Sequence, residues 1–244
     1  MTDPARPAWP KAVLFDLDDT LWPIAPVIAQ AELALYAWLQ RHAPRVAAGH
    51  SVDSLRQARL ALLERAPALR LDLGELRRAG LHAAFAEAGE DSAKVAPAMA
   101  HFFAARNAVA PYPDVLPGLT RLAGLGRPGR SLLVGSISNG NADLAAIGMA
   151  QHFTVSLAAH QLGVAKPDPA IFLAACAALG VAPHEAVYVG DDVLLDVRGA
   201  QQAGLRAVWL NRTGSALHLE HGVAPDAICT DFGQLLDWLE RTHA

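Results

Sequence analysis

The sequence has only two cysteines, Cys176 and Cys229, among its 244 residues. They lie far apart, and they form neither the even, closely spaced set of a disulfide-stabilised domain nor the Cys-x-x-Cys pair of a metal or redox site. The pattern therefore excludes a disulfide framework and a paired-cysteine metal centre. Each thiol is expected to be buried and free.

The sequence also lacks an excess of either charge and any long apolar run. Its 20 Lys and Arg against 24 Asp and Glu give a formal net charge of −4, so nucleic acid and membranes are not expected partners. No apolar run reaches the length of about 20 residues that a membrane span needs. Residues 1–11 carry Asp3, Arg6 and three prolines instead of a basic region followed by an apolar one, so no secretory signal is predicted. The expected location is the cytoplasm.

The apolar content of 52% and the charged content of 18% are those of a chain that folds. From residue 111 onward, short apolar runs alternate with segments of helical periodicity, which predicts a parallel sheet covered by helices on both faces. We therefore predict an α/β fold with a Rossmann-like parallel sheet core. Residues 1–22 and 111–244 form the predicted core domain, and residues 23–110 interrupt it after the first strand.

The interrupting segment has few strand signals and repeats Ala, Leu, Glu and Arg at helical spacing. It is predicted to be all-helical. Because Gly and Pro interrupt helices and Ser and Asp begin them, breaks are expected at Ala43-Pro44, Ala66-Pro67, Gly89 and Pro97, with Ser51, Asp72 and Asp91 as helix caps.

The first candidate functional residues follow the apolar run 12–15. Asp16 and Asp18 lie two residues apart and point to the same side of an extended chain, so they can share one site. Like charges this close push the two pKa values apart, leaving one carboxylate ionised and the other able to carry a proton. The pair fits a nucleophile with a general acid/base, although an acidic surface turn has the same pattern. Trp22 follows, and it is expected either to line a substrate entrance or to pack under the helical insert.

Three further polar clusters follow later predicted strands. Taken alone, each has an ordinary interpretation: a turn, a solvated lysine, and a helix cap made by Asp191 or Asp192. The carboxyl ends of parallel strands meet at one edge of a sheet and bind ligands there, so the clusters together indicate one site. Carboxylates suit Mg²⁺, and neutral donors and lysine suit phosphate. The clusters are Ser138-Asn139-Gly140, Lys166, and Gly190-Asp191 with Asp196 beyond.

These motifs resemble those of the haloacid dehalogenase-like (HAD) hydrolase superfamily over nearly the whole chain. The family's Asp-x-Asp-x-Thr signature matches Asp16, Asp18 and Thr20, and its Ser/Thr, Lys and Gly-Asp-x-x-x-x-Asp motifs match Ser138, Lys166 and Gly190, Asp191 and Asp196. The helical insert resembles the family's helical cap domain. The resemblance implies a HAD-like core with an inserted all-helical cap.

The resemblance also implies a role for each matched residue. Asp16 would be the catalytic nucleophile and Asp18 the general acid/base. Mg²⁺, the implied cofactor, would be bound by the Asp16 side chain, the Asp18 backbone carbonyl and Asp191. The implied phosphate-binding residues are Thr20, Ser138, Asn139 and Lys166, and the implied supporting residues are Gly190 and Asp196.

Asp18 separates two branches of that family. Displacing a halide needs no proton for the leaving group, and the dehalogenase branch has no acidic residue at this position, so Asp18 favours a phosphatase. The predicted function is Mg²⁺-dependent hydrolysis of a small phosphomonoester through an aspartyl-phosphate. Residues 138–143 and 189–203 are most similar to bacterial phosphatases acting on flavin mononucleotide (FMN) and on the phosphorylated ribitylamino-uracil of riboflavin synthesis. FMN or a sugar phosphate is the expected substrate.

Three alternatives stay open on the sequence. A phosphomutase of the same superfamily would share the motifs, and a haloacid dehalogenase would share them apart from the acidic residue at position 18. A non-catalytic phospho-acceptor or binding protein would also place Asp, Ser and Lys at strand ends, although the doubled carboxylate and the large insert argue against it. A monomer and a homodimer fit equally well.

Overall fold

The computed structural model describes residues 9–125, 131–215 and 222–243. The chain divides into two compact units, each described here by itself. The α/β unit comprises Met1–Pro23, Ala110–Asn139 and Met149–Ala244, and the helical unit comprises Ile24–Val109 and Gly140–Gly148. Residues 140–148 thus group with the helical unit, whereas the sequence placed them in the core.

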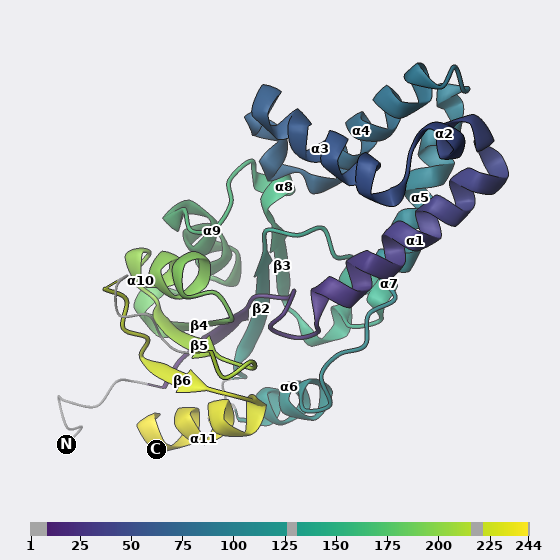
Figure 1. Ribbon diagram of the computed structural model, residues 1–244. Helices are drawn as coiled ribbons and strands as arrows, with labels where there is room; N and C mark the ends of the chain where they lie inside the picture. The colour runs from purple at the N-terminus through teal and green to yellow at the C-terminus, as the bar shows by residue number, and fades with distance from the viewer. Residues whose placement is uncertain (1–8, 126–130, 216–221, 244) are drawn as a thin grey trace, which may run out of the picture. The chain divides into compact units, whose positions relative to one another are not determined.

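The α/β unit is built on a parallel sheet of six strands, in the order β3-β2-β1-β4-β5-β6 (Figure 1). The first strand is central because the chain runs outward from it to β2 and β3 and then returns to add β4, β5 and β6 on its other side. Ligands bind at such a switch point in open α/β sheets. The strands are β1 (Ala12–Phe15), β2 (Leu133–Ser138), β3 (Val155–Ala158), β4 (Ala186–Gly190), β5 (Arg206–Leu210) and β6 (Ala227–Cys229).

Helices cover both faces of this sheet (Figure 1). On one face, Leu14 and Tyr188 share an apolar core with Phe172. On the other, Phe15 stacks on Phe232 with ring centroids 5.3 Å apart. Gly118 allows this packing, because a Cβ there would lie 2.3 Å from the Phe232 ring. The α/β prediction is confirmed. The helices of this unit are α6 (Val115–Gly124), α8 (Ala159–Leu162), α9 (Pro169–Leu179), α10 (Gly199–Gln202) and α11 (Phe232–His243).

The helical unit contains no strand among its described residues. Ser51 and Asp72 cap helices and Asp91 caps a short 3₁₀ turn, as predicted. The break expected at Pro97 is wrong: α5 runs through it, because Pro97 lies in the first helical turn, where a missing N–H removes no helical hydrogen bond. The helices are α1 (Ile24–His42), α2 (Pro44–Gly49), α3 (Val52–Arg65), α4 (Leu73–Glu87), α5 (Val95–Arg106) and α7 (Leu144–Ile147).

Both cysteines are buried and free, as expected. Burial raises the pKa of each thiol to about 11, so neither is a ready nucleophile. None of the described helices combines the length and the apolar character that crossing a bilayer would take.

A buried ionic cluster joins four helices of the helical unit. Glu32 of α1 accepts hydrogen bonds from Arg59 of α3 and Arg77 of α4, the latter at 3.2 and 3.3 Å. The Arg77 guanidinium also lies 3.6 Å from the ring centroid of Phe102 on α5. Burial and the nearby charge of Arg59 lower the pKa of Arg77 to about 10, although the charge of Glu32 raises it. Glu32 is therefore the counter-charge that lets the Arg77 guanidinium be buried beside the partly buried guanidinium of Arg59.

Replacing Glu32→Gln is expected to lower the free energy of unfolding by about 2 to 4 kcal/mol, because the buried guanidinium of Arg77 and the partly buried one of Arg59 lose their counter-charge. Urea denaturation followed by circular dichroism measures this. The control is Glu75→Gln, which breaks the exposed Glu75–Arg78 pair and should cost no more than about 1 kcal/mol. Equal losses for the two variants would contradict a structural role for the cluster.

Candidate active site

Asp16 lies directly beyond β1, at the carboxyl edge of the sheet. Its backbone N–H donates to the Val189 carbonyl of β4 at 2.9 Å, so the strand pairing continues to this residue and fixes it. Only 6% of Asp16 is exposed. The chain then turns at Asp19, whose φ of 63° is in the left-handed region that Asp tolerates better than most residues. This turn brings the Thr20 hydroxyl back to Asp16 Oδ2 at 3.2 Å.

Lys166 is the buried cation of the site. Its Nζ lies 2.5 Å from Asp16 Oδ1 and 2.6 Å from Asp196 Oδ1. Although burial alone would lower the pKa of Lys166, the two carboxylates raise it above its ordinary value. Lys166 therefore stays charged, and it joins two carboxylates that are 180 positions apart in the sequence.

Asn139 bonds to the backbone of Lys166, and its predicted phosphate-binding role stays a prediction. Its Oδ1 accepts from the Lys166 backbone N–H at 2.8 Å, and its Nδ2 donates to the Lys166 carbonyl at 3.0 Å. The side chain thus holds the lysine backbone instead of pointing both polar groups at a ligand. Ser138, the last residue of β2, is 3% exposed and lies directly before it.

The fourth motif supplies two carboxylates with distinct partners. Asp191 Oδ1 accepts from the Thr20 hydroxyl at 3.0 Å. Asp192, not Asp191, caps the following turn by accepting from two backbone N–H groups at 2.7 and 2.8 Å. The turn is a π-helix, Val193–Arg198, and it places Asp196 over the strand end. A Cβ at Gly190 would lie 2.3 Å from the Asp196 carboxyl carbon, which explains the glycine of the motif.

Sequence reasoning missed Tyr188, in the middle of β4. Its fully buried hydroxyl accepts from Lys166 Nζ at 3.0 Å and lies 3.1 Å from Asp196 Oδ1 and 3.3 Å from the Ile137 carbonyl, to which it can donate. A tyrosine in an otherwise apolar buried strand needs a partner for its hydroxyl, and this was the available signal. Tyr188 therefore links β2 to the lysine and the last carboxylate.

Asp18 accepts a hydrogen bond from a tryptophan. Its Oδ1 accepts from the indole N–H of Trp22 at 2.8 Å. The side chain is partly exposed, whereas Asp16 and Asp196 are buried. The two carboxylates of the first motif thus have different surroundings: Asp16 faces Lys166, and Asp18 faces a neutral donor.

The carboxylates outnumber the cation they surround. One oxygen from each of Asp16, Asp191 and Asp196 lies within 4.8 Å of the others, and three ionised carboxylates against one ammonium leave two negative charges in excess. Burial raises the pKa of Asp16 well above its ordinary range, although the positive charge of Lys166 lowers it. Burial and repulsion from Asp196 raise the pKa of Asp191 to about 6. Hard oxygen ligands with this excess charge fit a divalent cation.

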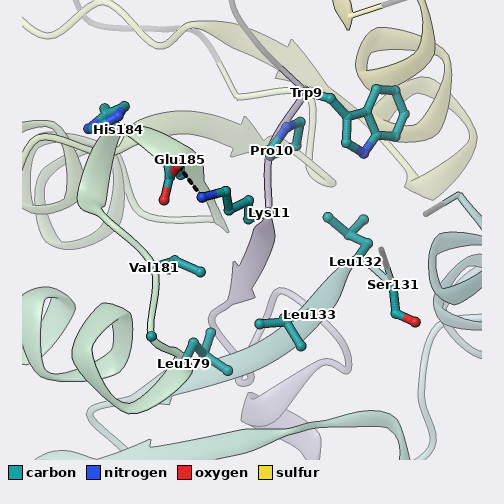
Figure 2. Close-up of a pocket in the computed structure, with 11 residues that line it drawn as sticks. Trp9, Pro10, Lys11, Ser131, Leu132, Leu133, Leu179, Val181, His184 and Glu185 are labelled. Carbon is teal, nitrogen blue, oxygen red and sulfur yellow. Dashed lines mark ion pairs between the residues drawn. The ribbon is translucent and has the colours of Figure 1, made fainter. Parts of the chain in front are cut away.

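A cavity of about 590 Å³ lies at the opposite edge of the sheet (Figure 2). It is lined by residues next to the amino ends of β1, β2 and β4, including Lys11, Leu133 and Glu185. Lys11 and Glu185 form an ion pair beside it. Among the described residues that line this cavity, none comes from the four motifs, so it is separate from the site.

Comparisons with known proteins agree with this geometry. A sequence model of haloacid dehalogenase-like hydrolases matches residues 10–204. A phosphoserine phosphatase of Thermus thermophilus is 33% identical over 235 residues, covering 83% of this chain and 89% of that protein. The 5-amino-6-(5-phospho-D-ribitylamino)uracil phosphatase YigB of Escherichia coli is 30% identical over 204 residues, covering 82% and 83%. The chain belongs to the haloacid dehalogenase-like hydrolase family, so the predicted family and hydrolase class are confirmed.

A similar solved structure is named for dehalogenation instead of phosphate hydrolysis. The 2-haloacid dehalogenase of Pseudomonas syringae pv. Tomato DC3000 is 40% identical and covers 95% of this chain and 98% of that one, with a TM-score of 0.86. The family and fold are thus shared by proteins named for two reactions.

In a chelating buffer at pH 8, Asp191→Asn is expected to raise the free energy of unfolding by about 1 to 3 kcal/mol. The pKa of Asp191 is raised from 3.8 to about 6, so the folded state is destabilised increasingly as the pH rises from about 4 to about 6, and by a constant amount above. The gain should therefore vanish near pH 4. Urea denaturation at several pH values measures it.

The matched control is Asp192→Asn, which keeps the helix cap and lies outside the three-carboxylate cluster. It should give no gain at pH 8. A second readout is thermal stabilisation by Mg²⁺, which Asp191→Asn should reduce. If the Asp191→Asn variant is no more stable than wild type at pH 8, the excess negative charge does not lower the free energy of unfolding.

Proposed function

We propose that the protein is a Mg²⁺-dependent phosphatase that hydrolyses a small phosphomonoester through an aspartyl-phosphate. The observation that carries this proposal is the cluster of buried Asp16, Lys166 and Asp196 with the partly buried Asp191 at the sheet edge, and with Asp18 two residues from Asp16. The cluster pairs a carboxylate nucleophile with a fixed cation, and its excess negative charge suits a divalent ion.

In the proposed reaction, an Asp16 oxygen attacks phosphorus while the bond to the leaving alcohol breaks. Asp18 gives its proton to that alcohol, then takes a proton from water as the water oxygen attacks phosphorus and frees Asp16. Mg²⁺ would be held by Asp16, Asp191 and the Asp18 carbonyl, and when bound it would neutralise charge on the phosphoryl oxygens. No residue is left changed after the two steps.

The remaining matched residues are proposed to support this chemistry. Lys166 offers its ammonium to the phosphoryl group, and Ser138 offers its hydroxyl and backbone beside it. Thr20 orients Asp16 and Asp191 through its hydroxyl, and Asn139 fixes the lysine backbone. Gly190 makes room for Asp196, which holds Lys166. The helical unit is proposed to be the family's cap domain.

Hydrolysis of a haloacid is the second candidate, favoured by the 40% identity to a protein named 2-haloacid dehalogenase. The presence of Asp18 supports the phosphatase, since halide departure needs no proton. The curated relatives named above are phosphatases of phosphoserine and of a phosphorylated ribitylamino-uracil. FMN, a sugar phosphate or a similar metabolite in the cytoplasm stays the proposed substrate.

Phosphate release from a panel of metabolites, including FMN, phosphoserine and sugar phosphates, tests the proposal. Release should require Mg²⁺, stop in EDTA, and fall at least about 1000-fold in Asp16→Asn because the nucleophile is lost. Asp168→Asn, which keeps the cap of α9 near Lys166, should retain activity.

Other products would identify the alternatives. Halide release from 2-chloropropionate without phosphate release from any ester would identify a dehalogenase. Isomerisation of a sugar phosphate without net phosphate release would identify a phosphomutase.

A further inference from the structure

We propose that Trp22 is a positioning residue for Asp18. Its indole selects the carboxyl oxygen through which Asp18 transfers its proton. This role rests on the proposed phosphatase function and goes beyond it. The observation is the 2.8 Å hydrogen bond from the indole N–H of Trp22 to Asp18 Oδ1, made by a tryptophan that is fully buried.

The backbone fixes the indole in place. Asp19 N–H donates to the Trp22 carbonyl at 2.7 Å, and Asp18 and Trp22 form an isolated parallel bridge. The loop between them is also held from outside, since Arg212 Nε donates to the Thr20 carbonyl at 2.7 Å. A buried side chain on a loop held at both ends can act as a fixed reference point for the partly exposed Asp18.

The chemistry of the indole makes this contact directional. An indole nitrogen is a donor only, with no acceptor capacity. Oδ1 therefore accepts a hydrogen bond in either protonation state of Asp18. Because the carbonyl oxygen of a carboxylic acid is the better acceptor, the indole favours Oδ1 as that oxygen and the acid proton on Oδ2. A hydroxyl or an imidazole partner could reverse its hydrogen bond, but the indole cannot. Trp22 thereby favours proton transfer through Oδ2.

A neutral donor also suits a group that must both give and take a proton. Lysine or arginine at this place would form an ion pair with Asp18 and oppose its protonated form. The indole holds the carboxyl group through one oxygen without adding a charge. Orientation matters because a general acid acts only within hydrogen-bond reach of the atom it protonates.

The test compares substrates that differ in their need for a proton on the leaving group. Alkyl phosphates release a poor leaving group that must be protonated, whereas p-nitrophenyl phosphate releases a stable phenolate. In Trp22→Phe, kcat/KM for an alkyl phosphate should fall about 10- to 100-fold, and that for p-nitrophenyl phosphate by less than about threefold. A purely structural role would lower both by the same factor, and that result would overturn the proposal.

A second variant protects the test against loss of fold. Benzothienylalanine at position 22 keeps the two-ring shape of tryptophan and replaces its N–H with sulfur, and it should show the same selective loss. Trp209→Phe removes an indole that donates to the Asp191 carbonyl instead, so it should affect both substrates alike. In an Asp18→Asn background, Trp22→Phe should lose its selectivity.

The outcomes separate this inference from the function beneath it. Wild-type protein that hydrolyses neither ester would overturn the proposed function and this role with it. Wild-type hydrolysis with a selective loss in both position-22 variants supports the role. Wild-type hydrolysis with unchanged selectivity in the benzothienyl variant overturns the role of Trp22 alone.

Discussion

The site depends on the pairing of the buried Lys166 ammonium with two carboxylates. A charge in a protein interior is tolerated only when it is paired and hydrogen-bonded, and Lys166 meets this condition through Asp16, Asp196 and the Tyr188 hydroxyl. Asn139 holds its backbone from the end of β2. One cation thus fixes the ends of β1 and β2, the loop before α9 and the π-helical turn after β4.

The same arrangement leaves the site short of positive charge. Asp191 joins Asp16 and Asp196 within 4.8 Å, and burial keeps water from screening their repulsion. Folding supports this arrangement because the strands and turns that carry the carboxylates are held by the sheet and its apolar core. The excess negative charge therefore favours binding of a cation or a proton at the site, and it lowers the stability of the folded protein. Such a loss is common where function requires like charges to lie close together.

The two carboxylates of the first motif show how one short segment provides two environments. Asp16 continues the pairing of β1 and is buried against a lysine. Asp18 lies beyond that pairing, partly exposed, and is held by a neutral indole. The turn at Asp19 separates the two, because a left-handed residue reverses the chain within a few positions. Nucleophile and acid/base chemistry can therefore be divided between neighbours in sequence.

Much of the fold could be predicted because its signals are local. Alternation of apolar runs with helical periodicity predicted the parallel sheet, and Ser51 and Asp72 marked helix starts because capping involves neighbouring residues only. The break at Pro97 was wrong because the sequence did not show where the helix began. A proline in the first turn leaves the helix intact, whereas one in the interior breaks it.

The sequence by itself determined which residue types stand at the strand ends, and so brought Asp16, Lys166, Asp191 and Asp196 to one edge. Only the tertiary structure decided how they are used: that Asn139 holds the lysine backbone, that Tyr188 meets the lysine, and that the Trp22 indole reaches Asp18. These choices depend on where hydroxyl, amide and indole groups find partners far away in the chain or across a turn. Partners of this kind are set by three-dimensional packing, which no local pattern encodes.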